Sequence, residues 1–116
     1  MNRAKKDASA LDACTGKSRE LVSLVEYSRD SIVSKTILDT PAGSIALFAF
    51  DKGQKLSEHT APYNAVLQVL DGSVKLTIGG EDVKVLAGEI IIMPANVPHS
   101  VAAEEKFKML LTMIRA

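Results

Sequence analysis

The sequence predicts an all-β fold, either a barrel or a sandwich of short strands. From Ser31 onward, apolar side chains recur at the period of two that is typical of strands. Gly, Pro and Asp interrupt these runs at short intervals, as turns between strands do. No stretch of comparable length has the helical period. Short, regularly spaced strands without helices are typical of β-barrels and β-sandwiches.

The first part of the chain lacks this alternation. Residues 1–19 mix charged, small and polar side chains without an apolar period, so we expect a flexible tail there. Residues 20–27, ELVSLVEY, fit either a helical turn or a short edge strand. We expect the remainder of the 116 residues, 20–116, to form one barrel domain.

The stretches after this segment are predicted strands. The plainest is SVKLTIGG, in which apolar and polar residues alternate and the closing Gly79-Gly80 pair signals a hairpin turn. Ile90 to Met93 is expected to be a short buried strand. The predicted strands cover residues 31–38, 43–50, 73–80, 81–86, 90–93, 99–103 and 107–115.

Two of these strands, GSIALFAF at 43–50 and KMLLTMIR at 108–115, are apolar on both faces. A closed barrel has room inside for only one face of each strand. If the other faces were exposed, they would form an apolar patch larger than soluble monomers usually carry. We therefore expect a second strand layer or a partner subunit to cover them, and we favour a homodimer.

Composition limits the classes of partner. The 14 basic and 14 acidic residues cancel, so no overall field attracts nucleic acid or an anionic membrane, and we expect neither as a partner. The single cysteine, Cys14, cannot form an internal disulfide. No run approaches the roughly 18 apolar residues of a membrane span, and no signal-peptide pattern is present. The expected location is the cytoplasm.

The two histidines lie in two stretches that each begin with a glycine, GQKLSEHTAPYNAVLQVLDG at 53–72 and GEIIIMPANVPH at 88–99. These stretches resemble the two motifs of the cupin superfamily, which read G-x5-H-x-H-x3,4-E-x6-G and G-x5-P-x-G-x2-H-x3-N. The resemblance covers residues 31–114. It implies a cupin-type jelly-roll β-barrel, also called a double-stranded β-helix, of the RmlC-like kind. It also implies a small bacterial conserved-barrel protein with a single domain.

Half of the metal-binding set that the motifs normally supply is missing. Ala61 and Ala65 stand where the family has its second histidine and its glutamate. Asn96 stands in place of the glycine of the second motif, and Ala103 in place of its final asparagine. The positions that match are Gly53, His59, Gly72, Gly88, Pro94 and His99.

Strand alternation places the remaining motif residues in one pocket. If residues 59–69 form a continuous strand, every second residue from His59 onward points the same way, and the resemblance implies that this is into the barrel. His99 and Val101 would face them, so we expect the two imidazoles to lie within a few ångströms of each other. The expected ligand pocket consists of His59, Ala61, Tyr63, Ala65, Met93, His99 and Val101.

Two imidazoles permit several chemistries. Neutral His59 and His99 could ligate a divalent metal, and Zn, Ni, Fe, Mn and Cu all remain candidates. A non-haem iron oxygenase is disfavoured, because Ala65 removes the carboxylate that the family supplies and Glu58 should point outward. Alternatively, the histidines hold no metal, either as remnants of the fold or, with Tyr63, as groups that orient a small organic ligand by hydrogen bonds.

The function that we predict is a small cupin barrel that binds a small molecule, with or without a divalent metal at the two histidines. A metal-dependent enzyme of the isomerase, epimerase or decarboxylase type is an alternative, in which the histidines act as acid, base or ligand. A non-catalytic sensor or accessory protein is another. The sequence leaves catalysis itself open and identifies no catalytic residue.

Overall fold

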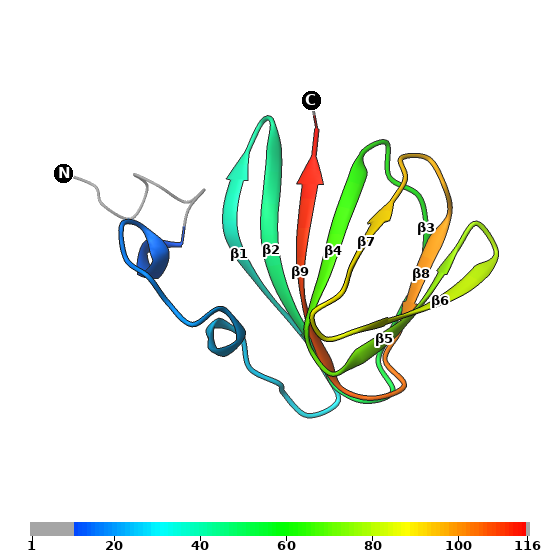
Figure 1. Ribbon diagram of the computed structural model, residues 1–116, viewed down its shortest axis with the longest axis horizontal. Coiled ribbons are helices and arrows are strands. Elements are labelled where there is room, and N and C mark those ends of the chain that lie inside the picture. The colour runs from blue at the N-terminus through cyan, green and yellow to red at the C-terminus, as the bar shows by residue number, and fades with distance from the viewer. Residues whose placement is uncertain (1–10, 116) are drawn as a thin grey trace.

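Two antiparallel β-sheets face each other in the computed structural model, which describes residues 11–115 (Figure 1). The five-stranded sheet has the order β1-β2-β9-β4-β7, and the four-stranded sheet has the order β3-β8-β5-β6. The all-β prediction is therefore confirmed. The strands are β1 (Ile32–Thr40), β2 (Gly43–Phe50), β3 (Lys55–His59), β4 (Asn64–Asp71), β5 (Ser73–Ile78), β6 (Glu81–Leu86), β7 (Ile90–Met93), β8 (His99–Ala102) and β9 (Phe107–Ile114).

Most strands lie where the sequence predicts them. The hairpin between β5 and β6 turns at Gly79 and Gly80, whose φ angles of 58° and 85° suit a tight turn of the type that glycine pairs favour. Residues 90–93 form the predicted strand, but only one of its faces is buried, with Met93 4% exposed and Ile91 packed against the core. β7 forms an edge of the five-stranded sheet, and Ile90 and Ile92 on its outer face are 62% and 60% exposed. These two side chains are therefore apolar residues on the surface of the sheet.

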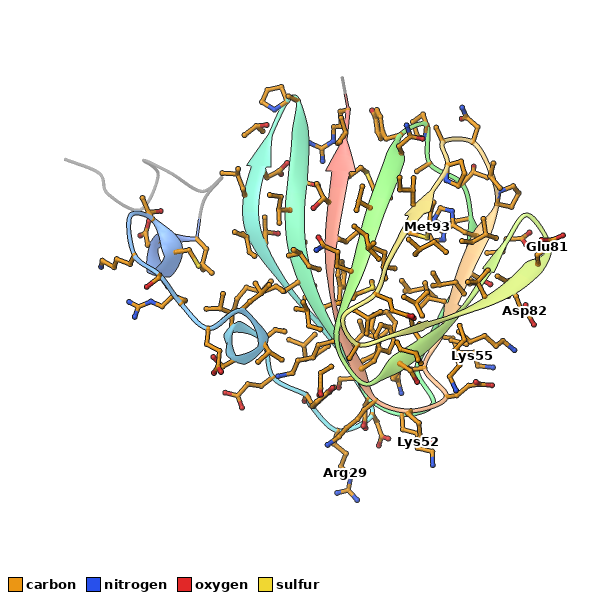
Figure 2. The ribbon with its side chains drawn as sticks, in the orientation of Figure 1. Arg29, Lys52, Lys55, Glu81, Asp82 and Met93 are labelled. Atoms are coloured by element: carbon orange, nitrogen blue, oxygen red, sulfur yellow. The ribbon has the colours of Figure 1, made fainter. Side chains whose placement is uncertain are left out.

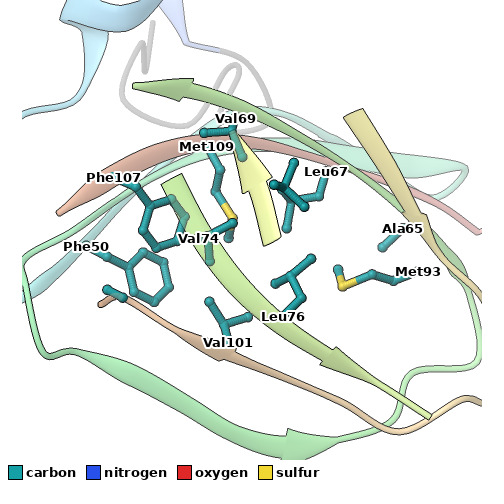
Figure 3. Packing of buried hydrophobic residues seen from close by; sticks show 12 residues of the cluster. Phe50, Ala65, Leu67, Val69, Val74, Leu76, Met93, Val101, Phe107 and Met109 are labelled. Atoms are coloured by element: carbon teal, nitrogen blue, oxygen red, sulfur yellow. The ribbon is translucent and has the colours of Figure 1, made fainter. Parts of the chain in front are cut away.

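The main core fills the space between the two sheets. Phe50 and Phe107 stack at one end, with ring centroids 4.7 Å apart and ring planes inclined by 22°. Figure 3 shows these rings at one end of the cluster, and Met93 and Ala65 at the other. The core is therefore filled by aromatic rings at one end and by smaller or flexible side chains at the other.

A second, smaller core lies on the outer face of the five-stranded sheet. Leu47 and Ala49 of β2 are fully buried there against Val25, which is 1% exposed. Val25 follows a short 3-10 turn, η3 (Leu21–Leu24), whose leucines pack into the same cluster. The cover that we expected from a strand layer or a partner subunit is thus supplied, over this part of the sheet, by the N-terminal segment of the same chain.

Polar contacts hold this segment in place. The Tyr27 hydroxyl donates to the Asp71 carboxylate at 2.6 Å, and the Lys108 ammonium donates to the Val22 carbonyl at 2.7 Å. Burial, and then the hydrogen bond to Asp71, raise the pKa of the Tyr27 phenol. The Lys106 and Lys108 ammonium groups also lie over the Tyr27 ring, at 4.7 and 5.1 Å from its centroid.

The predicted tail is described only from residue 11 onward, and residues 1–10 lie outside the described part. A second 3-10 turn, η2 (Asp12–Cys14), occurs here, and the Leu11 amide donates to the Ile37 carbonyl of β1 at 2.7 Å. A boundary between tail and domain at residue 19 stays a prediction. Among the described residues, no helix is long and apolar enough to cross a membrane.

Candidate functional site

His59 and His99 meet between neighbouring strands of the four-stranded sheet. His59 ends β3, His99 begins β8, and the two residues are direct cross-strand partners. Their ring centroids lie 4.4 Å apart and the rings are inclined by 66°, edge to face. His99 is buried, with 6% of its surface exposed, whereas His59 is exposed. One imidazole of the pair is therefore accessible to solvent, and the other lies inside the barrel.

A β-bulge explains how the His59 side chain comes to face inward. Leu56 pairs with Val101 and His59 pairs with His99, so β3 has one residue more than β8 between the two pairs. Such an extra residue bends the strand and redirects its side chains. Leu56 and His59 consequently line the same cavity although they are an odd number of residues apart. Glu58 lines a groove on the outer face of the sheet instead, as expected.

The two imidazoles are held in the same tautomer. Nδ1 of His59 lies 2.9 Å from the Ser57 carbonyl oxygen, and Nδ1 of His99 lies 3.1 Å from the Val97 carbonyl oxygen. A carbonyl oxygen only accepts hydrogen bonds, so Nδ1 must carry the proton in each ring. In the neutral form, each Nε2 then keeps a free lone pair. This arrangement, with a backbone carbonyl fixing the far side of the ring, is typical of histidines that ligate a metal or accept a hydrogen bond.

The loop before β8 places His99. Asn96 has a φ of 64°, in the left-handed region where the family motif has its glycine. Asparagine tolerates this region better than most residues with a side chain, so the loop keeps the turn that the motif requires. The Ala95 amide donates to the Asn64 side-chain oxygen at 2.9 Å, and the Asn96 amide donates to the Ala61 carbonyl at 2.8 Å. These bonds fix the loop to the start of β4.

The cavity between the sheets at this end has a volume of about 140 Å³. It is mostly apolar, and among the described residues no carboxylate lines it. Tyr63 is the one residue of the predicted pocket that does not line the cavity. The lining residues are Leu56, His59, Ala61, Ala65, Met93, His99, Val101, Met109, Leu111 and Met113.

The crossing of the chain between sheets explains why Tyr63 lies elsewhere. β3 belongs to the four-stranded sheet and β4 to the five-stranded sheet, so residues 60–63 connect two layers. The strict alternation that we assumed from His59 onward is interrupted there, at Pro62. Tyr63 is half-buried outside the cavity lining.

Sequence reasoning missed four lining residues. Met109, Leu111 and Met113 alternate along β9, and this period already placed them on one face of a strand. Leu56 carried no signal, since its inward direction depends on the bulge.

The donors present do not fit the metal-binding set of three histidines and one carboxylate that the cupin motifs imply. In the cavity, the nitrogen donors are the two imidazoles. Within residues 11–115, no group of three or more His, Cys, Asp or Glu side chains is placed to hold a metal. Ala61 and Ala65 both line the cavity, so the positions where those donors are missing belong to the same cavity as the histidine pair.

Comparison with known proteins agrees with the fold. A conserved protein of unknown function from Streptococcus pyogenes is 34% identical, with 86% of this chain and 88% of that chain covered and a TM-score of 0.83. A cupin 2 conserved barrel domain protein from Leptotrichia buccalis is 41% identical over 81% of this chain, which spans 46% of that longer protein, with a TM-score of 0.79.

A more distant structure shares the fold alone. A salicylate 1,2-dioxygenase mutant from Pseudoaminobacter salicylatoxidans, in complex with gentisate, is 19% identical over 72% of this chain and 25% of its own, with a TM-score of 0.67. No protein of curated function matches the chain. The family model described as the cupin domain matches residues 46–115. The two facing sheets are thus the predicted jelly roll, and the chain belongs to the cupin family.

Proposed function

We propose that this cupin barrel binds a small organic molecule in the cavity between its sheets, oriented by His59 and His99. The observation that carries the proposal is the convergence of two imidazoles, each with a free Nε2, on an otherwise apolar cavity. Apolar pockets with a few convergent polar groups are the usual form of small-molecule sites. The His pair would accept hydrogen bonds from hydroxyl or amide groups of the ligand.

The size of the cavity limits the ligand. A volume of about 140 Å³ is close to the roughly 150 Å³ of an apolar cavity that accommodates benzene. A single ring, or one end of a longer molecule that extends past His59, would therefore fit. Gentisate, which the distant salicylate dioxygenase structure contains, is a molecule of this size class.

The same pair offers a site for one metal ion, with water or the ligand in the remaining positions. Binding would be through the Nε2 lone pairs, and a bound metal would polarise a ligand oxygen. We keep the metal as an optional part of the proposal, because two imidazoles alone do not specify one.

The decisive experiment is calorimetry with a panel of single-ring phenols and small hydroxy acids. Wild type should bind at least one of them, and His59→Ala/His99→Ala should lose that binding while remaining folded by circular dichroism. Glu58→Ala, which changes the outer face of the same strand, is the matched control and should bind as wild type does. Binding that survives in the double histidine variant would contradict the proposal. Metal analysis of protein purified without a His-tag tests the optional metal.

Catalysis is a second candidate, favoured by the position of His59. An exposed imidazole with a free Nε2, beside a buried one of the same tautomer, can remove a proton from a bound molecule. An isomerase, epimerase or decarboxylase would use the pair in this way. Turnover of any ligand found above, followed by NMR and lost in His59→Ala, would favour the enzyme; bound ligands that remain unchanged would favour a sensor or accessory protein.

We also propose a homodimer, through the part of the predicted outer face that the N-terminal segment leaves uncovered and its continuation over β4 and β7. Beyond the area that the N-terminal segment covers, the outer face of the five-stranded sheet still carries exposed apolar side chains. Ile45, Thr112, Val66 and Ile92 form one cross-strand row over β2, β9, β4 and β7. A twofold partner would cover this row with the same surface.

A further inference from the structure

Two methionines stand on either side of Ala65. Met93 of β7 and Met113 of β9 are both cross-strand partners of Ala65 in β4, one on each side. All three line the cavity, and Met93 is only 4% exposed. The small Ala65 therefore stands between the two methionines in one cross-strand row of the five-stranded sheet. Figure 3 shows Met93 extending beside Ala65 at this end of the core.

The histidine pair lies at the same end of the barrel. The inward residues of β9 run from Phe107, at the end closed by stacked rings, to Met113. The four-stranded sheet contributes His59 and His99 to the cavity that Met113 lines. The lining residues with metal-donor groups are therefore the two histidines and the methionines Met93, Met109 and Met113, with no carboxylate among the described lining residues.

This set of donors discriminates between metals. Thioethers and neutral imidazoles are soft or borderline ligands, which suit Cu(I) far better than hard oxygen-seeking cations. A divalent ion here would keep its full double charge in a mostly apolar cavity, since every ligand is neutral. The cost of transferring an ion out of water grows with the square of its charge, so a monovalent ion incurs about a quarter of the cost for a divalent ion of the same size.

We propose that the cavity is a site for monovalent copper, ligated by His59, His99 and a thioether of Met93 or Met113. The inference rests on the metal option of the proposed function and specifies which metal the pair takes. Methionine is flexible enough to bring its sulfur to a metal without movement of the strand. Burial of Met93 also protects its thioether from oxidation.

The test is a competition for Cu(I) under anaerobic, reducing conditions with a chromogenic Cu(I) chelator. Cys14 would bind Cu(I) by itself, so every protein carries Cys14→Ser. Wild type in this background should take Cu(I) from the chelator in one-to-one ratio and bind Zn(II) much more weakly. Met93→Leu and Met113→Leu conserve volume, and at least one should weaken Cu(I) binding by about tenfold or more, because loss of even an outer-shell partner costs a metal site about tenfold.

Met109→Leu is the comparison variant. It also removes one thioether, but at a position deeper in the barrel, where Met109 pairs with Val69. Its loss of Cu(I) affinity should be smaller than that of the more sensitive of the other two variants. X-ray absorption at the copper edge should show nitrogen and sulfur neighbours, with the sulfur reduced in that same variant.

The outcomes separate this inference from the proposed function. Cu(I) binding that requires the histidines but is unchanged in both methionine variants would overturn the thioether ligand and leave a histidine metal site. Zn(II) binding tighter than Cu(I) would overturn the assignment of the metal. Failure to bind any metal, alongside binding of an organic ligand in the calorimetric experiment, would overturn this inference and leave the small-molecule proposal standing.

Discussion

Asn96 adopts a backbone conformation that most residues avoid. Its φ of 64° lies in the left-handed region, and its amide donates to the Ala61 carbonyl at the rim of the cavity. Asn96→Ala should lower the free energy of unfolding by about 1 kcal/mol, because alanine gains nothing from its side chain to offset the strain. Asn96→Gly should stay within about 0.5 kcal/mol of wild type, since glycine adopts this φ readily. Urea unfolding measures both, and equal losses in the two variants would contradict the backbone explanation.

Asp51 makes the fold sensitive to acid. The backbone amides of Asp30, at 2.7 Å, and Lys52, at 2.9 Å, donate to its carboxylate and lower the pKa of Asp51. A lowered folded-state pKa stabilises the fold above the ordinary value near 4, and this contribution is lost as the pH falls through the folded pKa. Asp51→Asn should therefore be less stable than wild type at pH 7, and the difference should shrink below about pH 4. Urea unfolding across this range tests the trend, and a constant difference would contradict it.

Single residues mark the limit of what the sequence could predict about the site. The spacing of His59 and His99 within two motifs was enough to place their rings together. The inward direction of Leu56 was not predictable, because the bulge in β3 depends on pairing with β8. The prediction that Tyr63 lines the pocket was wrong for a related reason. The chain changes sheets just before β4, and alternation holds only within one strand.

Among the elements, the N-terminal segment is expected to contribute to stability through its packing on β2. Val25 is 1% exposed and packs on Leu47 and Ala49 of β2. Val25→Ala removes buried methyl groups and leaves a cavity, so it should lower the free energy of unfolding by about 1–3 kcal/mol. Its exposed neighbour supplies the control, and Glu26→Ala should stay within about 0.5 kcal/mol. A Val25→Ala variant as stable as wild type would mean that the segment does not pack on β2 in solution.

The N-terminal segment shows why the strands were easier to predict than the residues that pack on their outer face. Strand positions follow from local alternation, which is visible within a few residues, as in 43–50. The apolar outer face of that strand was visible too, but its partner lies in residues 21–27, which have no regular period. The contact depends on the whole architecture, and no local pattern favours this segment over a second subunit.

At the scale of the whole molecule, the remaining apolar face predicts association. Ile90 and Ile92 are 62% and 60% exposed on the edge strand β7. Light scattering of wild type should give about twice the chain mass of 12.4 kDa. Ile92→Lys should shift the protein to monomer, because a buried charge without a partner is costly at an interface.

A matched control lies on the other sheet. Leu86 of β6 is also a large exposed apolar residue, at 47%, and Leu86→Lys should leave the mass unchanged. A monomeric wild type would contradict the proposed dimer, and loss of the dimer in both variants would contradict the choice of face.

The place of β9 in the five-stranded sheet has a consequence for the synthesis of the protein. β9 is made after the other eight described strands, yet it lies in the middle of the sheet, hydrogen-bonded to β2 on one side and to β4 on the other (Figure 2). The β1–β2 and β5–β6 hairpins can form from neighbouring residues as they leave the ribosome. The sheet that carries Ala65, Met93 and Met113 cannot close until Phe107–Ile114 has emerged. Until then β2 and β4 each have one unpaired edge, so the nascent chain is exposed to aggregation during this interval.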